Sequence, residues 1–271
     1  MTATTLEPSL PTPTRHRVSP LAGVRHGLTI GWRNLVRVKN APEQLIGFVL
    51  QPILFIALFV FLFGGAISGD WRTYLQFVLP GILVQTVVFA SMGTGASLAD
   101  DITKGVFDRF RSLPIARWAP LLGAVLADLA TYVVSVLVVL VAGLVLGFDF
   151  TGGPLGVLAG CLLVLAFTFA LSWVTATVGL LVRKPSGVQA LAIVVMMPLT
   201  FGSNLFADPS SMPGWLQAWV EVNPVSHLIT ATRGLFAGDP AAGATVAAVA
   251  WAVGIVVVFA PLAVWLYRRR A

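Results

Sequence analysis

Six long, nearly uncharged stretches constrain the fold of this chain more than any other feature of its sequence. Asp128 is the one charged residue inside them. A bilayer core of about 30 Å needs roughly 20 apolar residues in a helix, a length that every stretch exceeds. Charged residues make up 10% of the chain, whereas soluble proteins carry about a quarter. We therefore predict an all-α polytopic membrane protein with six spans, at 45–67, 74–98, 121–146, 155–182, 187–206 and 242–267.

The positions of lysine and arginine predict the orientation of the spans. Of the 17 such residues, all but Arg72 and Arg233 fall on one side of the predicted membrane. Because positive charge concentrates on the cytoplasmic side, we predict cytoplasmic N and C termini and a location in the cell membrane, plasma or inner. The net charge of +6 suits the anionic head groups of a lipid bilayer and does not indicate a nucleic-acid partner.

The chain before the first span divides into a tail and an amphipathic helix. Residues 1–20 are polar and lack an apolar core, so we expect a disordered cytoplasmic tail rather than a cleaved signal peptide. Over 21–40, apolar residues recur at helical spacing beside a basic face, which predicts a helix lying on the cytoplasmic leaflet. It is either a passive anchor or a collar that also touches a cytoplasmic partner. The transmembrane domain then covers 41–271, and the residues of interest in the helix are Arg25, Trp32, Arg33 and Arg37.

The connection between the second and third spans, 100–115, has the pattern of a short cytoplasmic helix. Its apolar stripe runs from Leu98 to Leu113, and Pro114 stops it. The opposite face alternates in sign, so its residues can pair along the helix. Such a helix either seats in a groove on another protein or is an ordinary interfacial loop. The alternating face consists of Asp101, Lys104, Asp108 and Arg111.

The segment 207–238 faces outside and is too long for a tight turn. It contains two amphipathic pieces, each too short to span, and the first carries Trp215 and Trp219. Tryptophans are typical of the head-group level of a bilayer. We predict re-entrant external helices between the fifth and sixth spans, with His227 as a hydrogen-bonded interfacial residue rather than a ligand.

Helix-breaking and charged residues inside the spans predict local departures from a plain bundle. Pro52, Pro80 and Pro198 should kink or terminate their helices. Asp128 lies roughly ten residues, or about 15 Å, into the third span. A carboxylate there is costly and has no basic partner in another span. It is either a polar tie to a neighbouring helix or to loop arginines, or a site for a cationic substrate or a conformational switch.

Motifs for catalysis and for metal binding are absent from the sequence. A Walker A loop needs Gly-Lys-Ser/Thr to hold phosphates, and no lysine of this chain follows a glycine. The three histidines are scattered, no cluster has metal-ligand spacing, and no nucleophile elbow is present. We therefore expect neither an enzyme nor a cofactor or metal in this chain.

Two of these segments resemble a known family. The run from Gly105 to Ile115, GVFDRFRSLPI, resembles the coupling-helix region of ABC-2-type exporter permeases, closest to the daunorubicin-resistance branch. The run from Asn223-Pro224 to Arg233-Gly234-Leu235, with Gly238 after it, is similar to that family's segment before the last span. The likeness extends over nearly the whole chain.

The resemblance implies a half-transporter that dimerises with a second copy or a paralogue. It would bind two separate ABC ATPase subunits, which hold ATP and Mg. The substrate would be a hydrophobic or amphiphilic, drug- or antibiotic-like molecule moved out of the cell, as in multidrug resistance. The alternative is lipid or glycan-lipid export. The residues expected to contact the ATPase, flanked by the helix 21–40, are Asp101, Lys104, Phe107, Asp108, Arg109, Phe110 and Arg111.

A substrate pathway is expected to use polar or soft side chains in otherwise apolar spans. Two hypotheses from other classes stay open: a secondary transporter driven by protons through Asp128, and a non-transporting membrane module. Dependence on an ATPase separates both from the exporter. The pathway candidates are Gln85, Thr86, Ser91, Asp128, Met196, Met197 and Asn204.

Overall fold

The computed structural model describes residues 42–104, 119–182 and 184–270, and every regular element in these ranges is a helix. The predicted all-α class is therefore confirmed for this part of the chain. The predicted tail 1–20 and helix 21–40 lie outside the described residues. In chain order the elements are α2 (Pro42–Ala57), the π-helix η1 (Leu58–Phe63), α3 (Gly64–Ser68), α4 (Trp71–Ala90), α5 (Met92–Thr103), α7 (Ala119–Leu146), α8 (Gly153–Leu181), α9 (Pro185–Phe201), the 3-10 helix η2 (Pro209–Ser211), α10 (Gly214–Val222), α11 (Pro224–Ala237) and α12 (Ala242–Arg270).

Five helical segments of the described chain are long and apolar enough to cross a membrane. They correspond to five of the six predicted spans. The remaining span, predicted at 187–206, is α9, which has 17 residues and is about 26 Å long at 1.5 Å per residue. Length alone therefore does not establish a sixth crossing. The five segments are Val49–Ser68, Trp71–Thr103, Gly123–Leu146, Gly153–Leu181 and Ala242–Tyr267.

Helix α9 ends earlier than predicted because other groups bind its terminal carbonyls. The Gly202 N–H donates to the Pro198 carbonyl at 2.9 Å. The side-chain amide of Asn223 donates to the carbonyls of Leu199 at 2.8 Å and Gly202 at 3.2 Å. These bonds satisfy acceptors that have no partner at a helix end. Residues 202–206 consequently form a turn instead of a last turn of helix.

Two of the three prolines do not terminate their helices. Helix α2 continues past Pro52, and α4 continues past Pro80 to Ala90. Helix α9 ends three residues after Pro198. Beyond α2 the backbone widens into the π-helix η1, an irregularity that is typically a single turn inserted in an α-helix and that no residue pattern predicted.

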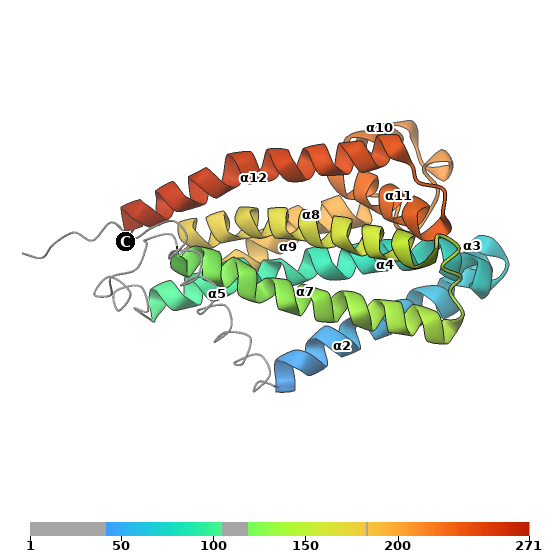
Figure 1. Cartoon of the computed structure of the whole chain (residues 1–271), viewed down its shortest axis with the longest axis horizontal. Coiled ribbons are helices and arrows are strands. Elements are labelled where there is room, and N and C mark those ends of the chain that lie inside the picture. The colour runs from blue at the N-terminus through green and yellow to red at the C-terminus, as the bar shows by residue number, and fades with distance from the viewer. Residues whose placement is uncertain (1–41, 105–118, 183, 271) are drawn as a thin grey trace, which may run out of the picture.

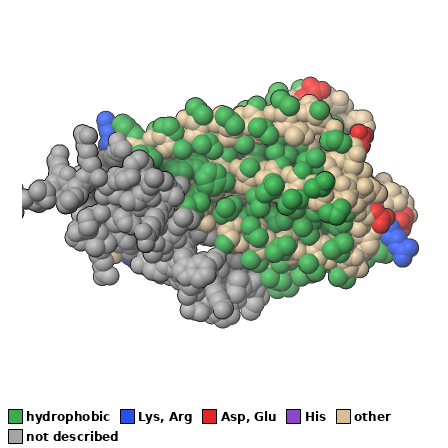
Figure 2. Space-filling model, viewed as in Figure 1, with side chains coloured by type: hydrophobic (Ala, Val, Ile, Leu, Met, Phe, Trp, Pro, Cys, Tyr) green, Lys and Arg blue, Asp and Glu red, His purple; other side chains and the backbone are tan. Residues whose placement is uncertain are grey.

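The helices run side by side along the long axis of the molecule, with α3, α10 and α11 gathered at the end opposite the C terminus (Figure 1). The α4–α5 segment is central, since 72% of its most apolar stretch is buried against 11% for α12. Helix α4 packs against α2, α7 and α11, while α5 packs against α8 and α9. On the face shown in Figure 2, apolar side chains cover the middle and charged side chains lie at the ends, as a bilayer requires.

Candidate functional site

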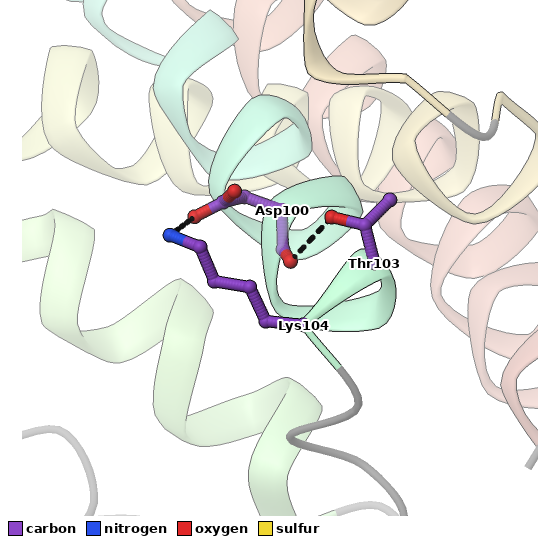
Figure 3. A network of polar contacts seen from close by, with 3 residues as sticks. All are labelled: Asp100, Thr103 and Lys104. Atoms are coloured by element: carbon purple, nitrogen blue, oxygen red, sulfur yellow. Dashed lines mark hydrogen bonds and ion pairs between the residues drawn. The ribbon is translucent and has the colours of Figure 1, made fainter.

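The C-terminal end of α5 leads into the predicted coupling segment. There the Lys104 ammonium pairs with the Asp100 carboxylate at 2.5 Å, and the Thr103 hydroxyl donates to the Asp100 carbonyl at 2.8 Å (Figure 3). Asp100 and Lys104 are four residues apart and exposed, so the pair adds a few tenths of a kcal/mol, roughly 0.3–0.5. Lys104 therefore pairs with Asp100, which lies outside the charged face predicted to begin at Asp101.

Most of the predicted contact residues cannot be placed. Of the apolar stripe, Leu98 is fully buried and Ile102 packs beside it in the same cluster, so this part of the stripe packs within the chain itself. The predicted contacts that lie outside the described residues are Phe107, Asp108, Arg109, Phe110 and Arg111, together with Arg25, Trp32, Arg33 and Arg37.

A chain of buried hydroxyl groups joins α5, α7 and α8 inside the bundle. The hydroxyls of Thr94 and Tyr132 lie 2.8 Å apart, and those of Tyr132 and Ser172 lie 2.9 Å apart. Ser172 in turn donates to the Thr168 carbonyl of its own helix at 3.0 Å. All four residues are buried, where a satisfied network fixes the arrangement of helices. Sequence reasoning missed Thr94, Tyr132 and Ser172. The sequence held one signal of this network: Tyr132 stands four residues after Asp128, so both lie on the same face of the helix.

Asp128 lies at this chain of hydroxyls, with its carboxyl group facing the Thr94 hydroxyl. The predicted inward position is therefore confirmed. Its Oδ2 atom is buried and has no hydrogen-bond partner. Thr94 belongs to α5, so the predicted polar tie of Asp128 to a neighbouring helix is present. The Oδ2 atom takes no part in it.

Glycines bring the backbones of α5 and α8 into direct contact at the same level. A Cβ atom on Gly95 would lie 2.2 Å from the Thr175 carbonyl oxygen, and one on Gly179 would lie 2.3 Å from the Gly95 carbonyl oxygen. The Thr175 hydroxyl donates to the Ser91 carbonyl at 2.8 Å, at the junction of α4 and α5. Close approach of this kind depends on small residues, and it makes α5 and α8 one packed unit.

Helix α11 is bound into the bundle at both of its ends, as a re-entrant element would be. Asn223 caps its first turn by accepting from the Val225 N–H at 2.9 Å. Near its other end, the Arg233 guanidinium donates to the carbonyls of Phe77 at 3.1 Å and Asn204 at 3.2 Å. Burial lowers the pKa of Arg233 to about 10, so the group stays charged at neutral pH. These contacts give the second motif, from Asn223 to Arg233, a structural role.

His227 is half-buried on α11. Its backbone N–H donates to the Asn223 carbonyl at 3.3 Å. Its imidazole makes no hydrogen bond within the described residues, so the predicted side-chain hydrogen bond is not seen.

The predicted pathway residues lie apart from the apolar groove between α2 and α7. Thr86 donates to the Ile82 carbonyl of its own helix at 2.7 Å, and Met197 is half exposed on α9. The other candidates, Gln85, Ser91, Met196 and Asn204, are buried. A groove of about 630 Å³ lies elsewhere, between α2 and α7, and its lining, from Val49 to Phe61 and from Val134 to Leu146, is almost entirely apolar.

The fold and these sites describe a helical membrane domain that has no nucleotide-binding motif of its own. Residues 26–237 match the ABC-2 type transporter family, and the chain belongs to that family. It is 44% identical over 243 residues to the daunorubicin resistance ABC transporter permease protein of Streptomyces coeruleorubidus, covering 90% of this chain and 86% of the relative. It is 33% identical over 245 residues to the doxorubicin resistance ABC transporter permease protein of Mycobacterium tuberculosis, covering 86% and 82%. The resemblance read from the two motifs is confirmed, and the chain is a multi-pass membrane protein.

Proposed function

We propose that this chain is the membrane-spanning permease subunit of an ATP-driven exporter for hydrophobic or amphiphilic, drug-like small molecules. The observation that carries the proposal is the 44% identity over 90% of the chain to a daunorubicin resistance permease. Two separate ATPase subunits would bind ATP and Mg, because the sequence has no Gly-Lys-Ser/Thr loop. A second copy or a paralogue would complete the membrane part, with the termini on the cytoplasmic side.

The central helices supply a route by which ATP hydrolysis can act on the membrane domain. The segment Trp71–Thr103 has 33 residues, about 50 Å at 1.5 Å per residue. Its cytoplasmic end carries the Asp100–Lys104 pair next to the coupling segment, and its external half accepts the hydrogen bond from Arg233 at Phe77. A displacement of the coupling segment would therefore move α5, the hydroxyl chain and α11 together.

Transport by the reconstituted complex tests this proposal. Vesicles with the permease and its ATPase should export doxorubicin when ATP is supplied, and a hydrolysis-dead ATPase should abolish that export. Transport that persists with the dead ATPase and stops when the proton gradient is collapsed would identify a secondary transporter. Assembly with the ATPase without movement of any compound would identify a non-transporting module. Movement of lipid alone would favour the lipid-export alternative.

Binding of the ATPase tests the coupling segment separately. Arg109→Glu reverses a charge in the predicted contact helix, so we expect the ATPase to be lost on co-purification while membrane insertion stays normal. Arg72→Glu, a matched reversal at the exposed N-terminal end of α4, should retain the ATPase. Unchanged recovery with Arg109→Glu would contradict the contact assignment.

A further inference from the structure

The apolar groove between α2 and α7 runs along the outside of the bundle. Its volume of about 630 Å³ lies within the range of about 300–1,000 Å³ that is usual for ligand sites. The two helices are in contact, and they diverge towards the N-terminal end of α2 (Figure 1). Val145 on the groove wall is 80% exposed. The groove is therefore an apolar hollow that opens towards the surrounding bilayer.

The groove has about the length of one lipid leaflet. Its walls run from Val49 to Phe61 and from Val134 to Leu146, and each is about 18 Å long at 1.5 Å per residue. The hydrocarbon of a bilayer is about 30 Å thick, so each leaflet contributes about 15 Å. An acyl chain therefore matches the groove in length. A helix of about 10 Å diameter and that length fills roughly 1,400 Å³, so a helix of a second copy is too large to lie inside.

One end of the groove carries two aromatic rings and a cation. The ring of Phe61, which lines the groove, lies 5.3 Å from the Trp71 ring, and the Arg72 guanidinium carbon lies 5.2 Å from the centre of the Trp71 ring. Arg72 is exposed and makes no ion pair within the described part of the chain. The neighbouring carboxylate, Asp70, instead accepts from the Thr73 N–H at 3.2 Å. Tryptophan is typical of the head-group level of a bilayer, so Arg72 is placed to meet a lipid head group.

We propose that the groove between α2 and α7 binds an anionic phospholipid, which stays with the protein and is not its cargo. The acyl chain would lie in the groove, and the head-group phosphate would pair with Arg72 beside the Trp71 ring. A guanidinium group binds phosphate through charge-assisted hydrogen bonds. A zwitterionic lipid carries a cation of its own, so it should bind more weakly. With the termini on the cytoplasmic side, as proposed above, this lipid belongs to the outer leaflet.

Native mass spectrometry of the full chain tests the site. The protein is delipidated in detergent and titrated with phosphatidylglycerol or with phosphatidylcholine of the same acyl chains, and the dissociation constant of the first bound lipid is measured. Wild type should bind phosphatidylglycerol about fivefold more tightly, the preference that one arginine gives at an anionic surface. Arg72→Gln should bind both lipids as wild type binds phosphatidylcholine.

Filling the groove separates this site from the general lipid shell. Ala57 lines the groove on α2, and Ala57→Phe should weaken the binding of both lipids at least tenfold. Ala250→Phe places the same ring on the exposed face of α12, outside the groove, and should bind both lipids as wild type does. Thermal unfolding in lipid-free detergent shows whether each variant is folded. Leu137→Trp, at a half-exposed residue of the α7 wall, fills the groove from the other side if Ala57→Phe does not fold.

Four outcomes would overturn the proposal. Unchanged lipid binding in a folded groove-filling variant, or equal weakening by Ala250→Phe, would leave only a general lipid shell. A preference for phosphatidylglycerol that persists in Arg72→Gln would remove the head-group assignment. Loss of a dimer in the groove-filling variants, without a change in lipid binding, would make the groove an interface between copies. ATP-driven transfer of the bound lipid to the other leaflet would make the lipid a cargo.

Discussion

The guanidinium of Arg233 lies 4.0 Å from the centre of the Phe77 ring and donates to the Phe77 carbonyl at 3.1 Å. One side chain of α11 thus holds both the ring and the backbone of a residue on α4. Phe77 stands three residues before Pro80, in the turn where a proline disturbs the helical hydrogen bonds. Arg233 therefore supplies a donor in the turn of α4 that precedes Pro80, and it fixes α11 to the central helix.

Replacing Arg233 by Gln should destabilise the protein. Hydrogen bonds to a charged group contribute about 1.5–3 kcal/mol each, and Gln cannot reach the Phe77 and Asn204 carbonyls together. We expect a loss of about 2–4 kcal/mol, measured as a lower thermal unfolding temperature in detergent. Arg72→Gln removes an exposed arginine whose guanidinium carbon lies 5.2 Å from the centre of the Trp71 ring, and it should change little. Equal effects of the two substitutions would contradict the proposed role of Arg233.

Tyr132→Phe should loosen the contact between α5, α7 and α8. The phenol hydroxyl is the middle member of the chain that joins Thr94 to Ser172, so its removal deprives both neighbours of a partner. The cost of leaving such groups unpaired is about 1–3 kcal/mol, and thermal unfolding would record it. If Tyr132→Phe unfolds at the same temperature as wild type, the hydroxyl chain does not hold these helices together.

Gly95 and Gly93, two residues apart on α5, should respond to alanine in opposite ways. A methyl group on Gly95 would overlap the Thr175 carbonyl oxygen, whereas one on Gly93 meets nothing within 4 Å. Gly93→Ala should stabilise the helix by about 0.5–1 kcal/mol through lower backbone entropy in the unfolded chain. Gly95→Ala should force α5 and α8 apart and reduce the yield of folded protein, as size-exclusion chromatography would show. Similar yields for both variants would contradict the close packing seen here.

The turn at Asp208 should loosen in acid. The hydroxyl and N–H of Ser210 donate to the Asp208 carboxylate at 2.6 Å and 2.8 Å, which lowers the pKa of Asp208 below its usual value. Because the folded pKa is the lower one, this stabilisation is present above the unfolded pKa of about 3.9 and is lost as pH falls through the folded value. Faster amide exchange at Ser210 below about pH 4 would show it. Asp208→Asn should exchange at a rate that does not depend on this titration.

Much of the transmembrane layout follows from single residues in the sequence. A charged side chain is too costly inside hydrocarbon, so the charges at the ends of the apolar stretches predicted all five membrane-capable segments of the described chain. Asp70, Asp149 and Asp239 are examples of these charges. The inward direction of Asp128 followed from the same argument. The short helices α10 and α11 were predictable as pieces that do not span, because each amphipathic piece is too short to cross a bilayer.

Tertiary structure decided where α9 ends and which groups of α5, α7 and α8 come into contact, and no pattern along the chain predicts either. The end of α9 at Phe201 depends on Asn223, which lies more than twenty residues later and takes the carbonyls that another turn of helix would have used. The contact between Gly95 and Gly179, and the hydrogen bonds that join Thr94, Tyr132 and Ser172, arise only when α5, α7 and α8 are packed. Hydrophobicity and charge are properties of each residue and act wherever it stands, so the sequence alone determined which segments enter the membrane. Hydrogen bonds and backbone contacts are short-range and directional, so only the folded bundle decided which polar groups meet.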